Sequence, residues 1–419
     1  MSKLEELIKR LCPDGDLRNV EVRTLSEVAE FFNGDRGKNY PNSSEMVEEG
    51  IPFVNAGDVN GIVDTVNCKK ITREKYNSLG GAKLQKHDIL YCLRGSTGKN
   101  GIYNEDEGTV ASSLVAIRVD ETKANYKYVY YLLNSKMEKA QRCKSDTGAA
   151  QPNLSAQSVK NYVFPFPSMQ EQRRIVYILD RFTFLTAKLE AELAARQKQY
   201  EYYRDLLLTF NDVHVGGTNS NVRWMKLEDI CDVRDGTHDS PKQVSNGRYL
   251  ITSKNIKKGI IDYTGAYYIS ESDFDKINLR SKVDKNDILF TMIGTIGDVG
   301  YVKNEPDYAI KNIGLIKTGN VLLSQYLKHY LVSRNAKIYI DSNKSKGSQA
   351  FLALGKLRSM PIPLLEEREM KRIVSILDRF DALCNDLTSG LPAEIALRQK
   401  QYEYYRDKLL TFKELKKEA

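Results

Sequence analysis

The sequence of 419 residues lacks the motifs that mark most catalytic sites. It contains no G-x-G-x-x-G cofactor fingerprint, no Walker A loop and no H-E-x-x-H pair. None of its 11 prolines adjoins another, so the N/D-P-P-Y/F pocket of amino-methyltransferases does not occur. Histidines number only four, and no carboxylates stand out in pairs for general acid–base chemistry. We therefore predict a protein that binds and does not catalyse, with no catalytic residues.

Cysteine motifs and long apolar runs are missing as well. The six cysteines form no C-x-x-C, and no histidines have metal-ligand spacing, which argues against a zinc site or a disulfide framework. A reducing compartment fits this cysteine usage best. No stretch approaches 18 apolar residues, and the amino-terminal residues lack an apolar signal-peptide core. We expect a cytoplasmic protein with no metal and no membrane span.

What the sequence does contain is a nearly identical repeat. Residues 196–210 read RQKQYEYYRDLLLTF and residues 398–412 read RQKQYEYYRDKLLTF, so 14 of 15 positions agree. Each copy follows the phrase ILDRF, at 178–182 and at 376–380. Both copies are rich in strong helix formers and lack Gly and Pro, which predicts helix. An internal repeat of this kind decides the architecture of the chain.

Apolar residues spaced by heptads predict that these helices pack on each other. Ile175, Phe182 and Leu189 lie one heptad apart, the pattern of a long helix that buries one stripe. We expect an antiparallel coiled coil within the chain, with a homodimeric coiled coil as the alternative. The second helix is four residues longer between its phrases, and Gly390 and Pro392 in that excess predict a break. The predicted spacer and partner positions are Ile178, Leu179, Phe182, Tyr200, Tyr203, Ile376, Leu377, Phe380, Tyr402 and Tyr405.

The segments between the helices also repeat, which makes the whole chain a tandem duplication. The sequence at 22–34, 51–63 and 86–101 is echoed at 222–236, 248–261 and 285–300. Short β-branched runs broken by Gly, Asn and Asp predict strands and turns. We predict an α+β fold: two similar mixed α/β domains, two long helices and an internal pseudo-two-fold. The expected segments are 1–167 (a domain with an amino-terminal helix at 4–11), 168–212 (helix), 213–364 (domain) and 365–419 (helix).

Charge and two loops point to a polyanionic partner. The net charge of +8 favours nucleic acid, although a solvated basic surface explains it equally well. The loop RGSTGKNG at 94–101 has the wrong spacing for a Walker A, and it reads either as a turn with positive-φ glycines or as an approach to DNA. The loop at 253–259 is a solvated turn or a phosphate contact. Candidate DNA-binding residues in these loops and the second-half counterpart are Arg94, Ser96, Thr97, Lys99, Asn100, Lys254, Asn255, Lys257 and Thr295.

Over essentially its full length the chain resembles the specificity (S) subunit of type I restriction–modification systems. The resemblance rests on ILDRF and RQKQYEYYRD at both sites, GLPAEIALRQ at 390–399, the K-x-D-I-L strands and TGAAQPNL at 147–154. It implies two DNA target recognition domains, each reading one half of a bipartite site in double-stranded DNA. Within TGAAQPNL, Gln151 and Asn153 become further candidates, while the second half has only the weak counterpart KGSQAFLAL at 346–354.

The resemblance also implies partners. The long helices would set the gap between half-sites and dock two methylase (M) subunits, and restriction (R) subunits would join the full complex. S-adenosylmethionine would be bound by the methylase subunits, so no cofactor is expected on this chain. Two other functions stay open from sequence: a coiled-coil scaffold for protein partners, and a methyltransferase with degenerate motifs.

Overall fold

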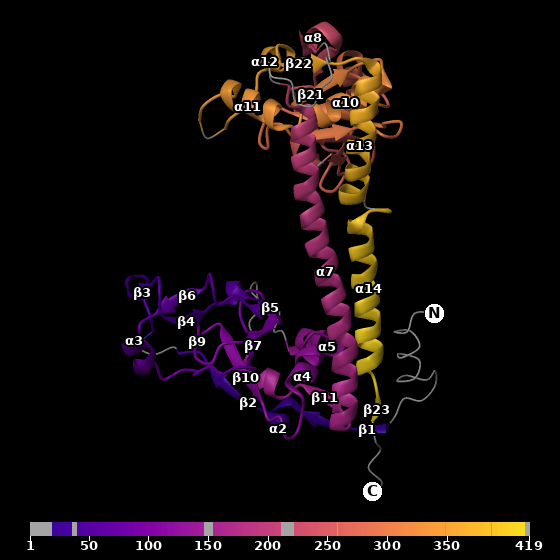
Figure 1. The fold of residues 1–419 in the computed structure, drawn as a ribbon. Helices are drawn as coiled ribbons and strands as arrows, with labels where there is room; N and C mark the ends of the chain where they lie inside the picture. The colour runs from indigo at the N-terminus through magenta and orange to yellow at the C-terminus, as the bar shows by residue number, and fades with distance from the viewer. Residues whose placement is uncertain are drawn as a thin grey trace. The chain divides into compact units, whose positions relative to one another are not determined.

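The computed structural model describes residues 19–35, 40–145, 154–210, 222–257, 259–347, 349–386 and 388–414. The helix predicted at 4–11 lies outside these residues. Contacts along the chain divide it into a first unit, residues 1–187 with 397–419, and a second unit, residues 188–396. Each unit contains one globular domain and parts of the long helices (Figure 1). The four consecutive segments expected from the sequence stay a prediction.

The described residues of the first unit form three β-sheets with strand orders β11-β1-β23, β2-β10-β7-β8-β5 and β3-β6-β4-β9. The strands are β1 (Asn19–Thr24), β2 (Ala29–Asn33), β3 (Met46–Val47), β4 (Ile51–Val54), β5 (Val59–Val63), β6 (Lys69–Ile71), β7 (Ile89–Cys92), β8 (Asn100–Ile102), β9 (Thr109–Val110), β10 (Leu114–Val119), β11 (Val163–Phe166) and β23 (Lys413–Glu414). The helices are η1 (Ser43–Glu45), η2 (Ala56–Asp58), α2 (Leu25–Val28), α3 (Arg73–Ser78), α4 (Tyr126–Leu133), α5 (Lys136–Ser145) and α6 (Ala156–Lys160).

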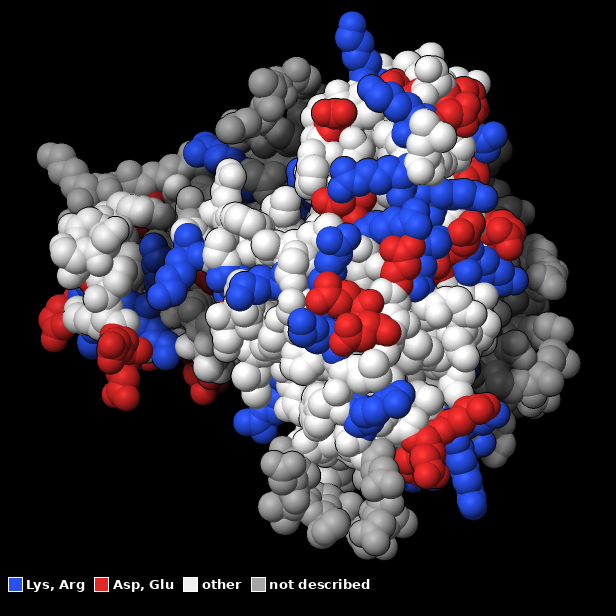
Figure 2. Space-filling model, turned by 90° about the horizontal axis from the view of Figure 1, so that it is seen from above, with Lys and Arg blue, Asp and Glu red and all other residues white. Residues whose placement is uncertain are grey.

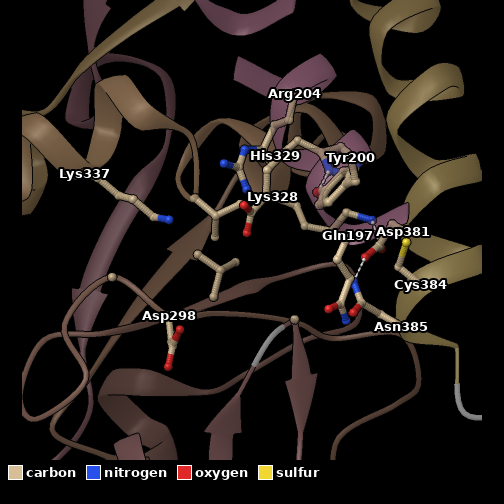
Figure 3. A pocket seen from close by; sticks show the side chains of 15 residues that line it. Gln197, Tyr200, Arg204, Asp298, Lys328, His329, Lys337, Asp381, Cys384 and Asn385 are labelled. Carbon is tan, nitrogen blue, oxygen red and sulfur yellow. Dashed lines mark hydrogen bonds and ion pairs between the residues drawn. The ribbon is translucent and has the colours of Figure 1, made fainter. Parts of the chain in front are cut away.

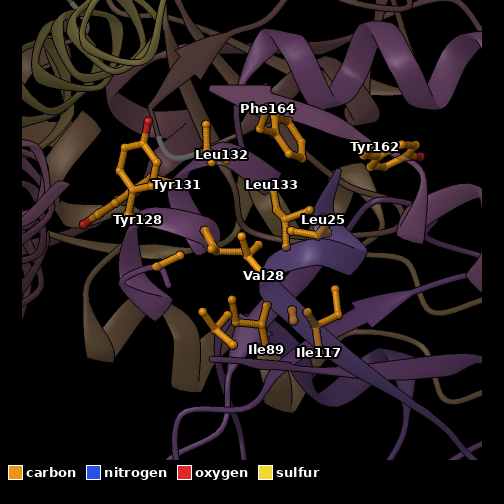
Figure 4. Packing of buried hydrophobic residues seen from close by; sticks show 14 of the residues in the cluster. Leu25, Val28, Ile89, Ile117, Tyr128, Tyr131, Leu132, Leu133, Tyr162 and Phe164 are labelled. Atoms are coloured by element: carbon orange, nitrogen blue, oxygen red, sulfur yellow. The ribbon is translucent and has the colours of Figure 1, made fainter. Parts of the chain in front are cut away.

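The core of this domain lies between the central strands and helix α4. Strand β10 reads LVAIRV and is buried at five of its six positions, as expected for an interior strand covered on both faces. In Figure 4 the side chains of Ile89 and Ile117 lie below Leu25 and Val28 of α2, with Leu132 of α4 on the same cluster. Asn125 caps α4 by accepting hydrogen bonds from the N–H groups of its first turn, which fixes where this helix starts.

In the described part of the second unit the strands form four sheets with orders β12-β22, β13-β21-β18-β19, β17-β14-β20 and β15-β16. The strands are β12 (Arg223–Lys226), β13 (Asp232–Asp235), β14 (Arg248–Thr252), β15 (Ile256–Lys257), β16 (Ile260–Ile261), β17 (Tyr267–Ile269), β18 (Ile288–Thr291), β19 (Val299–Tyr301), β20 (Tyr308–Lys311), β21 (Ile313–Lys317) and β22 (Pro361–Leu364). The helices are η3 (Ser253–Asn255), α8 (Leu227–Ile230), α9 (Glu271–Ser281), α10 (Val321–Tyr330), α11 (Arg334–Asn343) and α12 (Leu354–Arg358).

The long helices are α7 (Met169–Leu208), α13 (Glu367–Asn385) and α14 (Leu391–Leu410). The predicted break in the second helix is confirmed, because five residues separate the end of α13 from the start of α14. A Cβ on Gly390 would lie 2.6 Å from the carbonyl oxygen of Ala382, so only glycine fits the tight connection. Pro392 falls in the first turn of α14, where its missing N–H removes no helical hydrogen bond.

The repeated phrases pack on each other through stacked aromatic rings. In the first unit Phe182 stacks on Tyr405, with ring centroids 5.6 Å apart and planes at 25°. In the second unit Phe380 stacks on Tyr203 at 5.7 Å and 23°. The partner number falls as the number along α7 rises, so the two helical segments run antiparallel, as predicted. Each ILDRF phrase therefore packs on the YEYYRD phrase of the other helix. Among the described residues, no helix is long and apolar enough to span a membrane.

Candidate nucleic-acid interface

Three loops of the second domain meet at one end of its sheets. Strands β13 and β18 both pair antiparallel with β21, so that Asp235 lies opposite Gly314 and Thr291 opposite Ile313. The loops at 236–242 and 292–298 therefore leave the sheet at the same end. Strand β14 also ends there, because Thr252 pairs with Lys311 in the parallel strand β20. We call this region, around the turn at Asn312, the second loop end.

The first domain has the same construction. Strands β2 and β7 flank β10, with Asn33 opposite Val115 and Cys92 opposite Leu114. Strand β4 arrives beside them through the pairing of Val54 with Val110. The chain therefore leaves the sheets at one end at residues 34–35, 55–58 and 93–99, and we call this region the first loop end. The duplication seen in the sequence thus places corresponding loops at corresponding positions.

Glycines give the central loop of each end its shape. Gly95 and Gly98 have φ of 73° and 85°, and their counterparts Gly294 and Gly297 have φ of 80° and 96°. These values belong to the left-handed region, which residues with a Cβ rarely adopt. The prediction of a turn with positive-φ glycines is confirmed, and the same backbone shape recurs in the second half.

The predicted residues of the first loop end differ in accessibility. Arg94 and Ser96 are exposed, while Thr97 and Lys99 are half-buried. Asn100 is buried, and its amide donates to the carbonyl oxygens of Gly98 (3.0 Å) and Leu133 (3.3 Å). This corrects the expected DNA-binding role of Asn100. Its amide ties the loop to α4, and these hydrogen bonds within the protein leave it buried.

The second loop end gives a similar correction. Lys254, Lys257 and Thr295 are exposed. Asn255 is buried, accepts a hydrogen bond from the Thr252 N–H at 3.0 Å and donates to the carbonyl oxygen of Asp262 at 2.9 Å. Its amide closes the turn between β14 and β15, so the structure assigns Asn255 to the fold and leaves the lysines as the accessible candidates.

The TGAAQPNL segment has a spatial counterpart in the second half. Gln151 and Asn153 lie outside the described residues, but Leu154 donates its N–H to the carbonyl oxygen of Leu93 at 2.9 Å. Leu352, near the end of KGSQAFLAL, makes the same 2.9 Å bond to Met292. Both segments therefore join the first residue of the glycine loop in their own domain, which the weak sequence likeness did not establish.

Sequence reasoning missed a cluster at the second loop end, formed by Asp235, His238 and Arg280. Asp235 is the last residue of β13, His238 follows in the loop, and Arg280 comes from α9, 45 residues away from Asp235. Only the glycine that follows β13, repeated as Gly34 and Gly236, marked this loop as special in the sequence.

Charge on the visible surface is mixed. Figure 2 shows one face of the molecule, on which Lys and Arg side chains lie beside Asp and Glu side chains over much of the area. The whole chain has 63 basic and 55 acidic side chains, so the excess of positive charge is small. On this face, therefore, neither sign of charge forms a continuous patch.

Each domain is tied to the long helices through the aspartate of ILDRF. In the first unit Asp180 accepts hydrogen bonds at 2.6 Å from Lys127 and from the hydroxyl of Tyr131, both on α4. In the second unit Asp378 accepts from Lys328 at 2.8 Å and from His329 Nε2 at 2.7 Å, both on α10. The same carboxylate thus holds the corresponding helix of both domains.

The junction in the second unit is partly buried and borders a cavity of about 230 Å³. Figure 3 shows Tyr200 and Arg204 of α7, Lys328 and His329 of α10, and Asp381 of α13 around it. The carboxylate of Asp378 can only accept, so Nε2 of His329 donates to it, and Nδ1 lies 2.9 Å from the Tyr200 hydroxyl. Burial lowers the pKa of His329, which favours the neutral imidazole. Burial opposes ionisation of Asp378, but bonds from His329 and Lys328 outweigh it and hold its pKa at about 2.

The predicted helix positions are mostly at the cores. Ile178, Leu179 and Leu377 are fully buried and Phe182 is nearly so, while Ile376, Phe380, Tyr200, Tyr402 and Tyr405 are partly buried. Tyr203 is 37% exposed even though it stacks on Phe380. The neighbouring Tyr202 and its repeat Tyr404 are 64% and 60% exposed, so this ring lies on the surface in both repeats.

Comparisons with known proteins agree with this architecture. The sequence pattern of the type I restriction modification DNA specificity domain matches residues 18–196 and again 219–397. The specificity subunit of the type I restriction enzyme EcoR124I/EcoR124II of Escherichia coli is 35% identical over 309 residues, which cover 70% of this chain and 72% of that one. A putative type I specificity subunit of Haemophilus influenzae is 29% identical over 409 residues, 94% of this chain and 96% of that one.

Solved structures show the same fold. A chain from a study of complex assembly and conformational transition of the type I R-M system has a TM-score of 0.62 at 15% identity, covering 95% of this chain and 98% of that one. The S subunit of the M. genitalium type I system has a TM-score of 0.53 at 17% identity, covering 96% and 98%. The two matched domains and the relatives lead to one conclusion: the chain belongs to the type I restriction modification DNA specificity family, as a non-catalytic specificity subunit.

Proposed function

We propose that each loop end reads one half of a bipartite DNA site. The observation that carries this proposal is the contrast between repeated helices and diverged loops. The two helical phrases differ at one position in 15, whereas the corresponding loops RGSTGKNG and IGTIGDVG share little beyond their glycines. A protein that holds two readers in one frame needs constant helices and variable loops, because different side chains read different bases.

The long helices set the gap between the half-sites and dock two methylase subunits. The exposed rings of Tyr202 and Tyr404 support docking, since they are repeated positions that the fold leaves uncovered. The methylase subunits bind S-adenosylmethionine and transfer the methyl group, and restriction subunits join the complex for cleavage. This chain contributes recognition and geometry, and it acts in the cytoplasm, where the DNA lies.

The proposal is tested by mapping DNA methylation in cells that co-express this chain and its cognate methylase subunit. The expected result is one asymmetric motif with two short half-sites, a fixed gap and a modified adenine in each half. The mark should disappear when this chain is omitted. Adenine methylation that is absent, or that does not depend on this chain, would favour the scaffold hypothesis.

Assignment of each half-site to one domain uses paired variants. Arg94→Ala changes the first loop end and Lys254→Ala changes the second, and both residues are exposed. Each variant should reduce sequence preference in only one half of the motif, with a loss of about 1–3 kcal/mol where the removed contact is to a base. The two variants serve as controls for each other, because an equal effect on both halves would contradict separate readers.

A further inference from the structure

The second loop end contains a buried carboxylate with a separate partner on each oxygen. Asp235 is 6% exposed and ends strand β13. Its Oδ1 atom accepts a hydrogen bond from Nη2 of Arg280, in the last turn of α9. Its Oδ2 atom lies 2.9 Å from Nε2 of His238, in the loop that follows the strand. Both oxygens of one buried carboxylate therefore hold side chains that reach the surface.

The local sequence fixes this arrangement. Gly236 must be glycine because a Cβ there would lie 2.5 Å from the carbonyl oxygen of Ile310. The chain is then pinned across the β20–β21 turn, since Gly236 donates its N–H to Ile313 and Thr237 donates to Ile310. The second ring nitrogen of His238 lies 2.9 Å from Oδ1 of Asn312, in that same turn. Asp235 and His238 are thus held at the centre of the second loop end.

Arg280 is held by Asp235 through one guanidinium nitrogen, while most of its side chain is exposed. Its side chain is 64% exposed, whereas that of its carboxylate partner is 9% exposed. One of its nitrogens binds Asp235, and a guanidinium carries five N–H donors in a planar fork, so several donors face a cleft and solvent. This cleft of about 360 Å³ lies between the loop and α9, and its lining includes Thr237, His238 and Lys276 as well as the acidic Asp239 and Asp273 beside Arg280.

Such an anchored fork is suited to one kind of ligand. An ordinary flexible arginine loses side-chain freedom when it binds, whereas one held by a buried carboxylate has lost much of it already. A phosphate tolerates a flexible cation, but a base edge requires two donors at fixed positions. The acceptor pair that matches an arginine fork in the major groove is O6 and N7 of guanine.

We propose that Arg280 is a base-contacting residue of the second domain, which donates two N–H groups to a guanine edge, with Asp235 as its positioning residue. The inference rests on the proposed function and adds a specific contact to it. The first domain has Asn33 at the place of Asp235, since both residues precede the glycine and pair across the equivalent strand. An amide cannot anchor an arginine as a carboxylate does, so the contact belongs to the second half-site alone.

The test replaces the fork and keeps the charge. Arg280→Lys is made in the full chain, and the methylation motif is mapped with the cognate methylase subunit. Binding is then compared for DNA with each base at each position of the motif. We expect preference for guanine to fall about 5- to 150-fold at one base pair of one half-site, with the other half-site unchanged. Asp235→Asn should relax the same base pair, and a melting curve checks that this variant is folded.

Arg248→Lys is the matched control. Arg248 is also an exposed arginine paired with a carboxylate, Glu271 at 3.0 Å, but it starts strand β14 at the end away from the loops. Its motif should equal that of the unmodified chain.

Three outcomes would overturn the inference. An unchanged motif in Arg280→Lys, with an intact two-part motif in the unmodified chain, removes the base contact and leaves the proposed function standing. A uniform loss of affinity for all sequences in Arg280→Ala, with the salt slope reduced by about one, identifies a phosphate contact instead. An unmodified chain that produces no two-part motif refutes the proposed function, and this inference falls with it.

Discussion

The two domains share one architecture, but the space beneath the glycine loop is filled by a hydrogen-bonded ion pair in the first domain and by apolar side chains in the second. In the first domain the buried carboxylate of Glu138 accepts hydrogen bonds from the Tyr91 hydroxyl and, at 2.8 Å, from Nε of Arg142. Helix α5 thereby packs a guanidinium against the glycine loop, since a Cβ on Gly98 would lie 2.4 Å from that same Nε. The corresponding residues of the second domain are Phe290, Ala336 and Ile340.

The difference teaches which part of a domain the duplication holds constant. The glycine loop keeps its backbone shape in both domains, although one rests on an ion pair and the other on Ile340, which lies 3.0 Å from a Cβ placed on Gly297. At the junction with the helices the aspartate of ILDRF is retained, while its partner changes from Tyr131 to His329. The residue on the long helix is therefore the same in both units, whereas the residue of the domain that contacts it differs.

The largest losses of stability are expected in the first unit, and one of them follows from removing the buried carboxylate of its domain. Glu138→Ala leaves Arg142 and the Tyr91 hydroxyl without their partner, which should lower the free energy of unfolding by about 3–5 kcal/mol. Hydrogen exchange of amides in β7 and α5 would show that the loss is confined to the first unit.

A triple variant sharpens this comparison. Replacing Tyr91, Glu138 and Arg142 by Phe, Ala and Ile gives the first domain the residues of the second. Most of the lost stability should return, because an entire buried ion pair can be exchanged for apolar side chains at little cost. A triple variant as unstable as the single one would mean that the two packings are not interchangeable.

The stacked phenylalanines of ILDRF should differ in spite of their identical sequence. Phe182 is 3% exposed, so Phe182→Ala should cost about 3–5 kcal/mol of unfolding free energy. Phe380 is only partly buried, and Phe380→Ala should cost about half as much. Denaturant unfolding of both variants measures the difference, and equal losses would contradict unequal burial at the two stacks.

Lowering the pH should change the stability of the two units in opposite directions. His329 is buried and its pKa is lowered, so the unfolded chain binds a proton below its ordinary pKa of about 6.5 while the folded chain resists it. Stability of the second unit is therefore complete above that pH and decreases as the pH falls from 7 towards 5. Burial raises the pKa of Glu138, so the folded first unit takes up a proton more readily than the unfolded chain does. This group therefore makes the first unit more stable as the pH falls.

The pH prediction has a control taken from the other domain. His329→Tyr installs the residue that the first unit uses at this position and should remove the loss between pH 7 and 5. Hydrogen exchange measured separately for α4 and α10 at the two pH values gives the readout. An unchanged pH dependence in His329→Tyr would assign the effect to another group.

The smallest change in stability is expected from altering helix length. Residues 186–193 of α7, TAKL followed by EAEL, are exposed or partly exposed, so adding or deleting one tetrad removes little buried surface. Four helical residues span about 6 Å, and one base pair spans about 3.4 Å. The gap between half-sites should change by about one base pair while the half-sites stay the same. Methylation mapping decides, and an unchanged gap would refute a rigid spacer.

The parts of the fold that depend on neighbouring residues were predictable from the sequence. The long helices, the break at Gly390 and the positive-φ loop all follow from local propensity and from the repeat. The convergence of three loops was not predictable, because it depends on strand register, such as Asp235 opposite Gly314. The anchoring of Arg280 likewise joins residues 45 positions apart.

Two of the candidate site residues could not be assigned from the sequence for a related reason. Asn100 and Asn255 are polar residues in basic loops, where side chains usually face water. In the structure both amides satisfy backbone groups that would otherwise be buried without partners. A sequence shows that an asparagine can make such hydrogen bonds, but it does not show whether the partner is water, DNA or the backbone of the chain itself.

The first unit is discontinuous along the chain, and this has a consequence for biosynthesis. Leu409 and Leu410, near the end of α14, belong to the same buried cluster as Leu25 and Val28 of the first domain. A ribosome therefore completes the second unit, residues 188–396, before it supplies the last pieces of the first one. The domain that is translated first finishes folding last. A premature stop after residue 396 should damage recognition by the amino-terminal domain and spare the one translated later.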